Sequence, residues 1–294
     1  MVLLARFPSP EAGLSFDADD LLESLAELDP GQPLVIWVPG NSPDDDAVRA
    51  QAERLADRLE VGVVAFSWAG GSGSAAGSID KGMRPRNAGY GLLELLATLL
   101  HTDGLRSMWA GRAVALIVHG RAAKVLKAAV VERPDLIGEM CTSVVMAAAD
   151  ISYELQIDWL ARLTPRQTPD AVSVLWHDGD AALDNLLDGR LLYAAREVRV
   201  PQDLLETQVG VFGDSDPFHA VPEFEYIDVS PWVTPQEAQP WPEDAIHLSD
   251  EDLQAVDERR ATAVDEPCHT YAWTCDHPDF SELLSRLITK GGTW

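Results

Sequence analysis

The residues best suited to chemistry lie in the stretch 114–126. Residues 114–118 form an unbroken apolar run rich in β-branched side chains, which predicts a strand buried on both faces. After His119 and Gly120 the apolar residues recur at helical spacing, so the pattern indicates a strand, a very tight turn and a helix. A turn of this kind can expose a nucleophilic hydroxyl above the end of a sheet. Here the apex of the turn is Gly120, which has no side chain.

Strand and helix patterns alternate on both sides of this turn. Apolar strand patterns cover residues 33–38, 61–68, 114–119, 143–150, 172–180 and 224–229. The first 30 residues predict one amphipathic helix that closes the edge of the sheet, and residues 279–290 predict a packed terminal helix. This alternation predicts an α/β fold with a mainly parallel sheet of about eight strands and helices on both faces. In such sheets the functional residues lie beyond the carboxyl ends of the strands.

Five short motifs follow one another in the order known from one family. They cover residues 38–41, 66–70, 118–122, 180–183 and 268–271. On these motifs the chain resembles the α/β-hydrolase-fold families of unknown function that are common in actinobacteria. Those families have His-Ser-x-Gly where this chain has His119, Gly120, Arg121 and Ala122. The resemblance therefore implies an α/β-hydrolase fold in which glycine replaces the nucleophilic serine.

The same resemblance implies roles for other residues. Asp180 stands at the position of the triad acid, with Asp178 as the alternative, and His269 stands at the position of the triad base. Backbone N–H groups near Asn41 and Arg121 stand at the oxyanion hole. A triad that lacks its nucleophile keeps only the catalysis that comes from oxyanion stabilisation and binding.

Two functions follow from this arrangement. The first is a catalytically silent protein that binds a ligand or a partner protein through the former active-site cleft. The second is a serine hydrolase for an ester, amide or lactone, represented here by a Ser-to-Gly variant or using another nucleophile. The sequence leaves open whether the protein is an enzyme, and it implies no cofactor.

We expect a single domain over residues 1–294 with an insertion at about 231–266. The insertion is rich in acidic residues, proline and tryptophan, including Trp232 and Trp241, and lacks a regular period. Tryptophan supplies large contact areas, so this segment is predicted to cover the cleft or to contact a partner. The alternative is a solvated loop whose tryptophans pack back onto the core.

The composition argues against several classes of partner and site. The formal net charge of −26 repels nucleic acids and anionic membranes, and no apolar run reaches the ~20 residues of a membrane span. With no secretory leader pattern, we expect a cytoplasmic protein with reduced cysteines. The Gly/Ser segment 69–78 lacks the spacing of a nucleotide-binding loop. The cysteines, histidines and aspartate within 268–277 lack the spacing of a zinc site, so we expect no metal.

Overall fold

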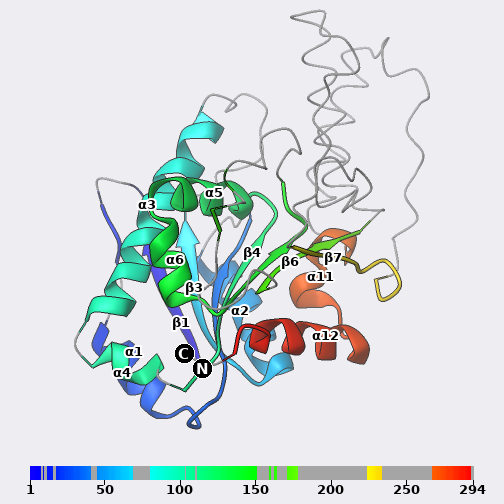
Figure 1. The fold of residues 1–294 in the computed structure, drawn as a ribbon, viewed down its shortest axis with the longest axis horizontal. Coiled ribbons are helices and arrows are strands. Elements are labelled where there is room, and N and C mark those ends of the chain that lie inside the picture. The colour runs from blue at the N-terminus through cyan, green and yellow to red at the C-terminus, as the bar shows by residue number, and fades with distance from the viewer. Residues whose placement is uncertain are drawn as a thin grey trace, which may run out of the picture.

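The computed structural model describes residues 1–7, 9, 12–15, 18–40, 45–68, 80–102, 104–109, 111–150, 159, 162–163, 171–177, 224–233 and 267–292. The described residues form one parallel sheet (Figure 1). Its strands are β1 (Val2–Phe7), β2 (Leu34–Val38), β3 (Gly62–Trp68), β4 (Val114–His119), β5 (Ser143–Ala147), β6 (Val172–Trp176) and β7 (Glu225–Asp228). The predicted α/β class is therefore confirmed.

The strand order is β1-β3-β2-β4-β5-β6-β7, which places β4 at the centre of the sheet. Every residue of β2, β3, β4 and β5 is buried, because helices cover both faces of these strands. This explains why the sequence shows apolar runs here rather than alternation. In the parallel register Val38 lies beside Val118, and His119 lies beside Ala147. The ends of β2, β4 and β5 therefore meet where β4 turns into its helix.

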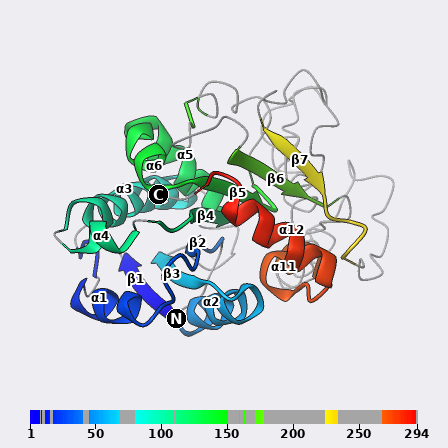
Figure 2. The ribbon, with the colours of Figure 1, turned by 60° about the horizontal axis from the view of Figure 1, so that its bottom comes forward.

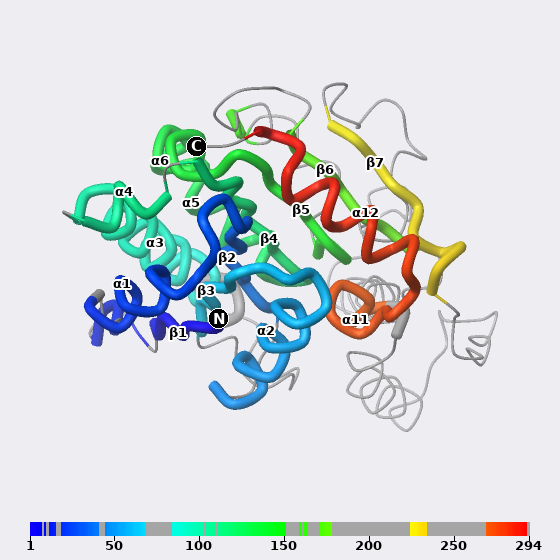
Figure 3. The backbone as a smooth tube through the Cα atoms, turned by 90° about the horizontal axis from the view of Figure 1, so that it is seen from below, coloured from blue at the N-terminus to red at the C-terminus, as the bar shows by residue number. Residues whose placement is uncertain are grey.

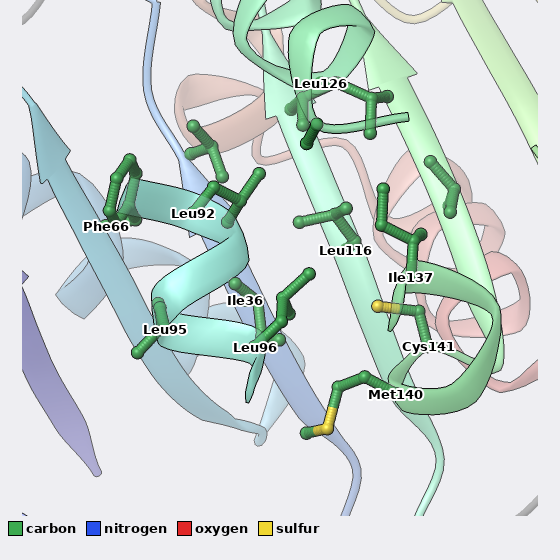
Figure 4. Close-up of a cluster of buried hydrophobic side chains, with 14 of the residues drawn as sticks. Ile36, Phe66, Leu92, Leu95, Leu96, Leu116, Leu126, Ile137, Met140 and Cys141 are labelled. Carbon is green, nitrogen blue, oxygen red and sulfur yellow. The ribbon is translucent and has the colours of Figure 1, made fainter. Parts of the chain in front are cut away.

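Two groups of helices form the outer layers (Figure 2). One face carries α1 (Ala18–Ala26), α3 (Asp80–His101), α4 (Leu105–Trp109), α5 (Ala122–Glu132) and α6 (Pro134–Met140). The other face carries α2 (Asp45–Leu59), α11 (Pro267–Thr274) and α12 (Pro278–Thr289), and α12 crosses β4 and β5 (Figure 3). Figure 4 shows part of the core between the sheet and the first of these helix groups, in which Leu92 and Leu96 of α3 lie near Ile36 and Leu116 of the sheet.

The N-terminal segment contains a strand that the sequence analysis missed. β1 pairs in parallel with β3 along its full length and forms the outer strand of the sheet. The predicted amphipathic helix is α1, which buries Leu21 and Leu25 on one face of the sheet instead of closing its edge. With β1 included, the described residues form seven strands, and the expected number of about eight is not confirmed.

Two further boundaries differ from the sequence expectation. The strand predicted over 143–150 ends at Ala147, because Ala148 has a φ of 48°, which a strand does not accommodate. The segment 268–271, the last of the five motifs and in the resembling families a turn, lies inside α11. The terminal helix is confirmed as α12, where the His277 ring accepts a hydrogen bond from the Asp279 N–H.

Only the first three residues of the predicted insertion, 231–233, are described. The Trp232 ring lies 6.3 Å from the Phe280 ring of α12, and Val233 is buried. This tryptophan thus packs onto the core, while Trp241 lies outside the described residues. Among the helices that are described, none combines the length and apolar character needed to cross a membrane.

Candidate functional site

The chain passes from β4 directly into α5 through a tight turn, which we call the elbow, with Gly120 at its apex. Gly120 has a φ of 53°, in the left-handed region that glycine adopts at little cost. Its N–H donates to the Ala147 carbonyl at 2.9 Å. Its carbonyl accepts from the N–H groups of Ala123 and Asp150, each at 3.1 Å. These bonds hold the apex against the neighbouring end of β5 and start the helix directly behind it.

His269 faces this apex, although the two positions lie in distant parts of the sequence. A Cβ built on Gly120 would lie 3.4 Å from His269 Nε2 and 3.5 Å from its Cε1. The His269 side chain belongs to α11 and is buried, with 8% of the residue exposed. A side chain at position 120 would therefore contact the imidazole directly.

His119 connects the elbow to α11. Its Nε2 lies 2.8 Å from the His269 carbonyl, and since a carbonyl only accepts, Nε2 carries the proton of the neutral ring. The His119 ring also packs edge-on against the rings of His269 and Trp273, with both centroids 4.6 Å away. His119 thus positions the helix that carries His269.

His119 makes the stability of the fold depend on pH. Burial, followed by the charge of His269, lowers the pKa of His119 well below 6.5, although its hydrogen bond opposes this shift. Below pH 6.5 the unfolded chain therefore binds a proton at this histidine that the folded chain does not. The free energy of unfolding thus rises with pH up to about 6.5, and above this pH the contribution of His119 is fully present. The slope from one such group is at most about 1.4 kcal/mol per pH unit.

We expect this slope to appear in urea unfolding at pH 7.5 and 5.5. The wild type should lose about 1 kcal/mol more on acidification than His119→Gln, in which an uncharged amide can keep the bond to α11. His101→Gln, at an exposed histidine of α3, controls for removal of a histidine elsewhere. Equal losses in the wild type and His119→Gln would contradict a neutral buried His119.

Tyr271 fixes α11 across the ends of β5 and β6. Its hydroxyl accepts from the Ala148 N–H at 2.7 Å and donates to the Leu175 carbonyl at 2.9 Å. Arg58 of α2 holds the other end of the helix by donating to the Cys275 carbonyl at 2.7 Å and to the Ala272 carbonyl. Burial lowers the pKa of this guanidinium, while the charges of Cys275 and Asp276 oppose the shift. His269 therefore lies on a helix anchored from two sides.

Tyr271→Phe should destabilise the fold by about 1–2 kcal/mol, because it removes both hydrogen bonds in a buried place. Tyr90→Phe is the matched control, since Tyr90 is exposed and donates only to Glu132, at 3.0 Å. This control should change stability by less than about 0.5 kcal/mol. Denaturant unfolding of both variants measures the difference, and equal effects would show that Tyr271 does not anchor α11.

The end of β2 closes the opposite side of the elbow. A Cβ built on Gly40 would lie 2.9 Å from the His119 carbonyl oxygen, 3.1 Å from His119 Nδ1 and 3.3 Å from the Arg121 nitrogen. Trp68 at the end of β3 donates its indole N–H to the Pro39 carbonyl at 2.8 Å. The backbone at residues 39–40 therefore packs against the residue that follows the apex, where an oxyanion hole would lie. Asn41 itself lies outside the described residues.

Asp150 is a buried carboxylate at the elbow that the sequence analysis did not single out. It follows β5, is 1% exposed, and binds Lys124 Nζ at 2.6 Å, with Arg121 Nε at 3.9 Å. Its position one strand along from the elbow, just past a strand end, is the signal that could have identified it. With its backbone bonded to Gly120, Asp150 contributes an ion pair that stabilises the start of α5.

The remaining candidates are the two residues considered for the triad acid, the cysteines and the residues considered as metal ligands. Asp178 and Asp180 lie outside the described residues, so the pairing of His269 with one of these carboxylates stays a prediction. Cys275 and Cys141 are free thiols, and burial raises the pKa of Cys141 to about 12. Within the described ranges no three histidine, cysteine or acidic side chains gather as metal ligands.

No protein-family model matches the sequence, and no curated protein matches it at a significant level.

Proposed function

We propose that this protein is a catalytically silent member of the α/β-hydrolase fold that binds a ligand or a partner protein at the site around Gly120. The observation that carries the proposal is the position of His269, whose Nε2 would lie 3.4 Å from a Cβ at the apex of the elbow. Glycine at this apex offers no atom that could attack a substrate. An imidazole that faces an apex without a side chain is what a hydrolase site without its nucleophile would have, and this supports the proposal.

The surroundings of the elbow support binding at this place. Backbone from residues 39–40, the start of α5 and a buried imidazole lie together at the carboxyl ends of the central strands. In the first turn of α5 the N–H groups of Ala123 and Lys124 donate to the carbonyls of Gly120 and Arg121. The positive end of the helix dipole still favours oxygen atoms of a ligand at this place. A carbonyl or carboxylate group is the chemistry that such a site would accept.

A fluorophosphonate probe tests catalytic silence directly. The unmodified protein should remain unlabelled and should show no turnover of short acyl esters above background. Ser67, at the end of β3, is a candidate for another nucleophile, but its hydroxyl donates to Asp45 Oδ1 at 2.6 Å. Labelling of the unmodified protein would show that another nucleophile operates, and would contradict the proposal.

The alternative function, a serine hydrolase seen here as a Ser-to-Gly variant, has one specific observation in its favour. His269 is held toward position 120 by Tyr271 and by the His119 hydrogen bond, as a general base would need to be. A native gene that encodes serine at position 120 would establish this alternative.

A further inference from the structure

The helix α11, which brings His269 to the elbow, buries less apolar surface than its neighbour α12. Among the described side chains of α11 the buried apolar ones are Tyr271 and Ala272, whereas α12 buries five apolar residues. Figure 3 shows α11 beside α2, while α12 crosses the sheet. Opening of α11 therefore exposes less apolar surface than opening of α12, so α11 should open at a lower cost in free energy.

The sheet keeps its hydrogen bonds when α11 leaves. The Tyr271 hydroxyl accepts from the Ala148 N–H and donates to the Leu175 carbonyl, and these two backbone groups also bond to each other at 3.3 Å. Neither group is thus left without a partner if Tyr271 withdraws. Arg58, which holds the other end of α11, is partly exposed on α2, so its guanidinium can turn to water. These contacts allow α11 to open while the sheet stays folded.

The contact between His119 and α11 depends on the protonation of His119. Its Nε2 already carries the proton that binds the His269 carbonyl, so a second proton would have to enter at Nδ1. Nδ1 lies toward Gly40, where a Cβ would be 3.1 Å away, and no hydrogen bond to Nδ1 occurs among the described residues. The charged ring would be buried, with 3% of the residue exposed. The closed position of α11 therefore requires a neutral His119.

The groups around His119 offer nothing that would stabilise its charged form. Among the described residues His269 is the titratable side chain in ring contact with His119, and a charge on His269 would repel one on His119. The other rings in contact are the indoles of Trp37 on β2 and Trp273 on α11, and the neighbour on β5 is Ala147. The charged side chains on the surrounding elements pair with one another: Lys124 and Arg121 with Asp150, and Arg6 with Asp45.

We propose that α11 is an acid-released cover of the site around Gly120, which opens when His119 takes up a proton and then carries His269 away from the apex. The inference rests on the proposed function, because the site that opens is the one assigned to a ligand or partner. Binding there should be favoured at neutral pH and weakened in acid. Since His119 stays neutral in the closed form, the equilibrium constant for opening should rise up to about tenfold per pH unit below 6.5.

Hydrogen–deuterium exchange of the wild type at pH 7.5 and 5.0, corrected for intrinsic exchange rates, tests this opening. At both pH values the backbone amides of α11 should be at least about tenfold less protected than those of α12. Between pH 7.5 and 5.0 the protection of α11 should fall by about ten- to thirtyfold, as uptake of one proton requires.

His119→Gln separates His119 from the other groups that titrate. Its amide can still donate to the His269 carbonyl but takes up no proton, so the protection of α11 should fall less than about threefold between the two pH values. His101→Gln, at an exposed histidine of α3, is the matched control and should show the full fall of the wild type.

Three results would overturn the proposal. Equal protection of α11 and α12 would show that α11 opens only when the whole domain unfolds. A full fall retained by His119→Gln would assign the proton to another group. If His119→Gln does not fold, the wild type alone decides, because a fall of less than about threefold at pH 5.0 contradicts release by a proton. Labelling of the unmodified protein by a fluorophosphonate would instead reject catalytic silence, and it would leave the release of α11 standing.

Discussion

Gly120→Ser should convert an unreactive protein into one that a fluorophosphonate labels. A serine Cβ would lie 3.4 Å from His269 Nε2, and its Oγ extends one bond further. A staggered rotamer can therefore bring the hydroxyl within about 3 Å of the imidazole, where the ring can accept its proton. The substitution should cost about 1 kcal/mol of stability, because a φ of 53° is unfavourable for any residue with a side chain. Mass spectrometry of the probe adduct measures the outcome.

Two controls separate the hydroxyl from other effects of this substitution. Gly120→Ala imposes the same backbone strain without a nucleophile and should remain unlabelled. Gly120→Ser combined with His269→Ala keeps the hydroxyl but removes the base, so its labelling should fall by at least about a hundredfold. A folded Gly120→Ser variant that stays unlabelled would contradict an intact catalytic frame and would favour a site used only for binding.

Gly40→Ala should destabilise the fold more than any other single substitution at the elbow. The new Cβ would lie 2.9 Å from the His119 carbonyl oxygen and 3.3 Å from the Arg121 nitrogen, and both atoms are backbone. Neither can move without displacing the elbow, so we expect a loss of about 2–3 kcal/mol, typical of overpacking in a dense core. Thermal or urea unfolding measures this loss. In a Gly120→Ser background the same change should also abolish labelling.

Gly111→Ala is the control for this substitution. A Cβ on Gly111 would meet no atom within 4 Å, and the cost there arises only from its φ of 79°. We therefore expect a loss of about 1 kcal/mol and unchanged labelling in the Gly120→Ser background. If Gly40→Ala were no more destabilising than Gly111→Ala, the close approach of β2 to the elbow would be wrong.

The sequence by itself determined the α/β class and the elements of the central sheet. Long apolar runs such as residues 114–118 occur only where helices cover both faces of a strand, so periodicity alone identified β2 to β6. The glycine at the elbow was also readable, because a strand that turns at once into a helix requires a left-handed residue. These are local properties, and a few consecutive residues determine each of them.

The tertiary structure alone decided which distant residues meet. β1 is a short edge strand of six residues, and its apolar pattern was too short to identify it as a strand. Its position in the sheet depends on pairing with β3. Asp150 became part of the elbow because β5 lies beside β4, and His269 faces Gly120 because Tyr271 and Arg58 anchor α11. Contacts across such separations depend on the packing of whole elements, whereas local spacing reports only on neighbours along the chain.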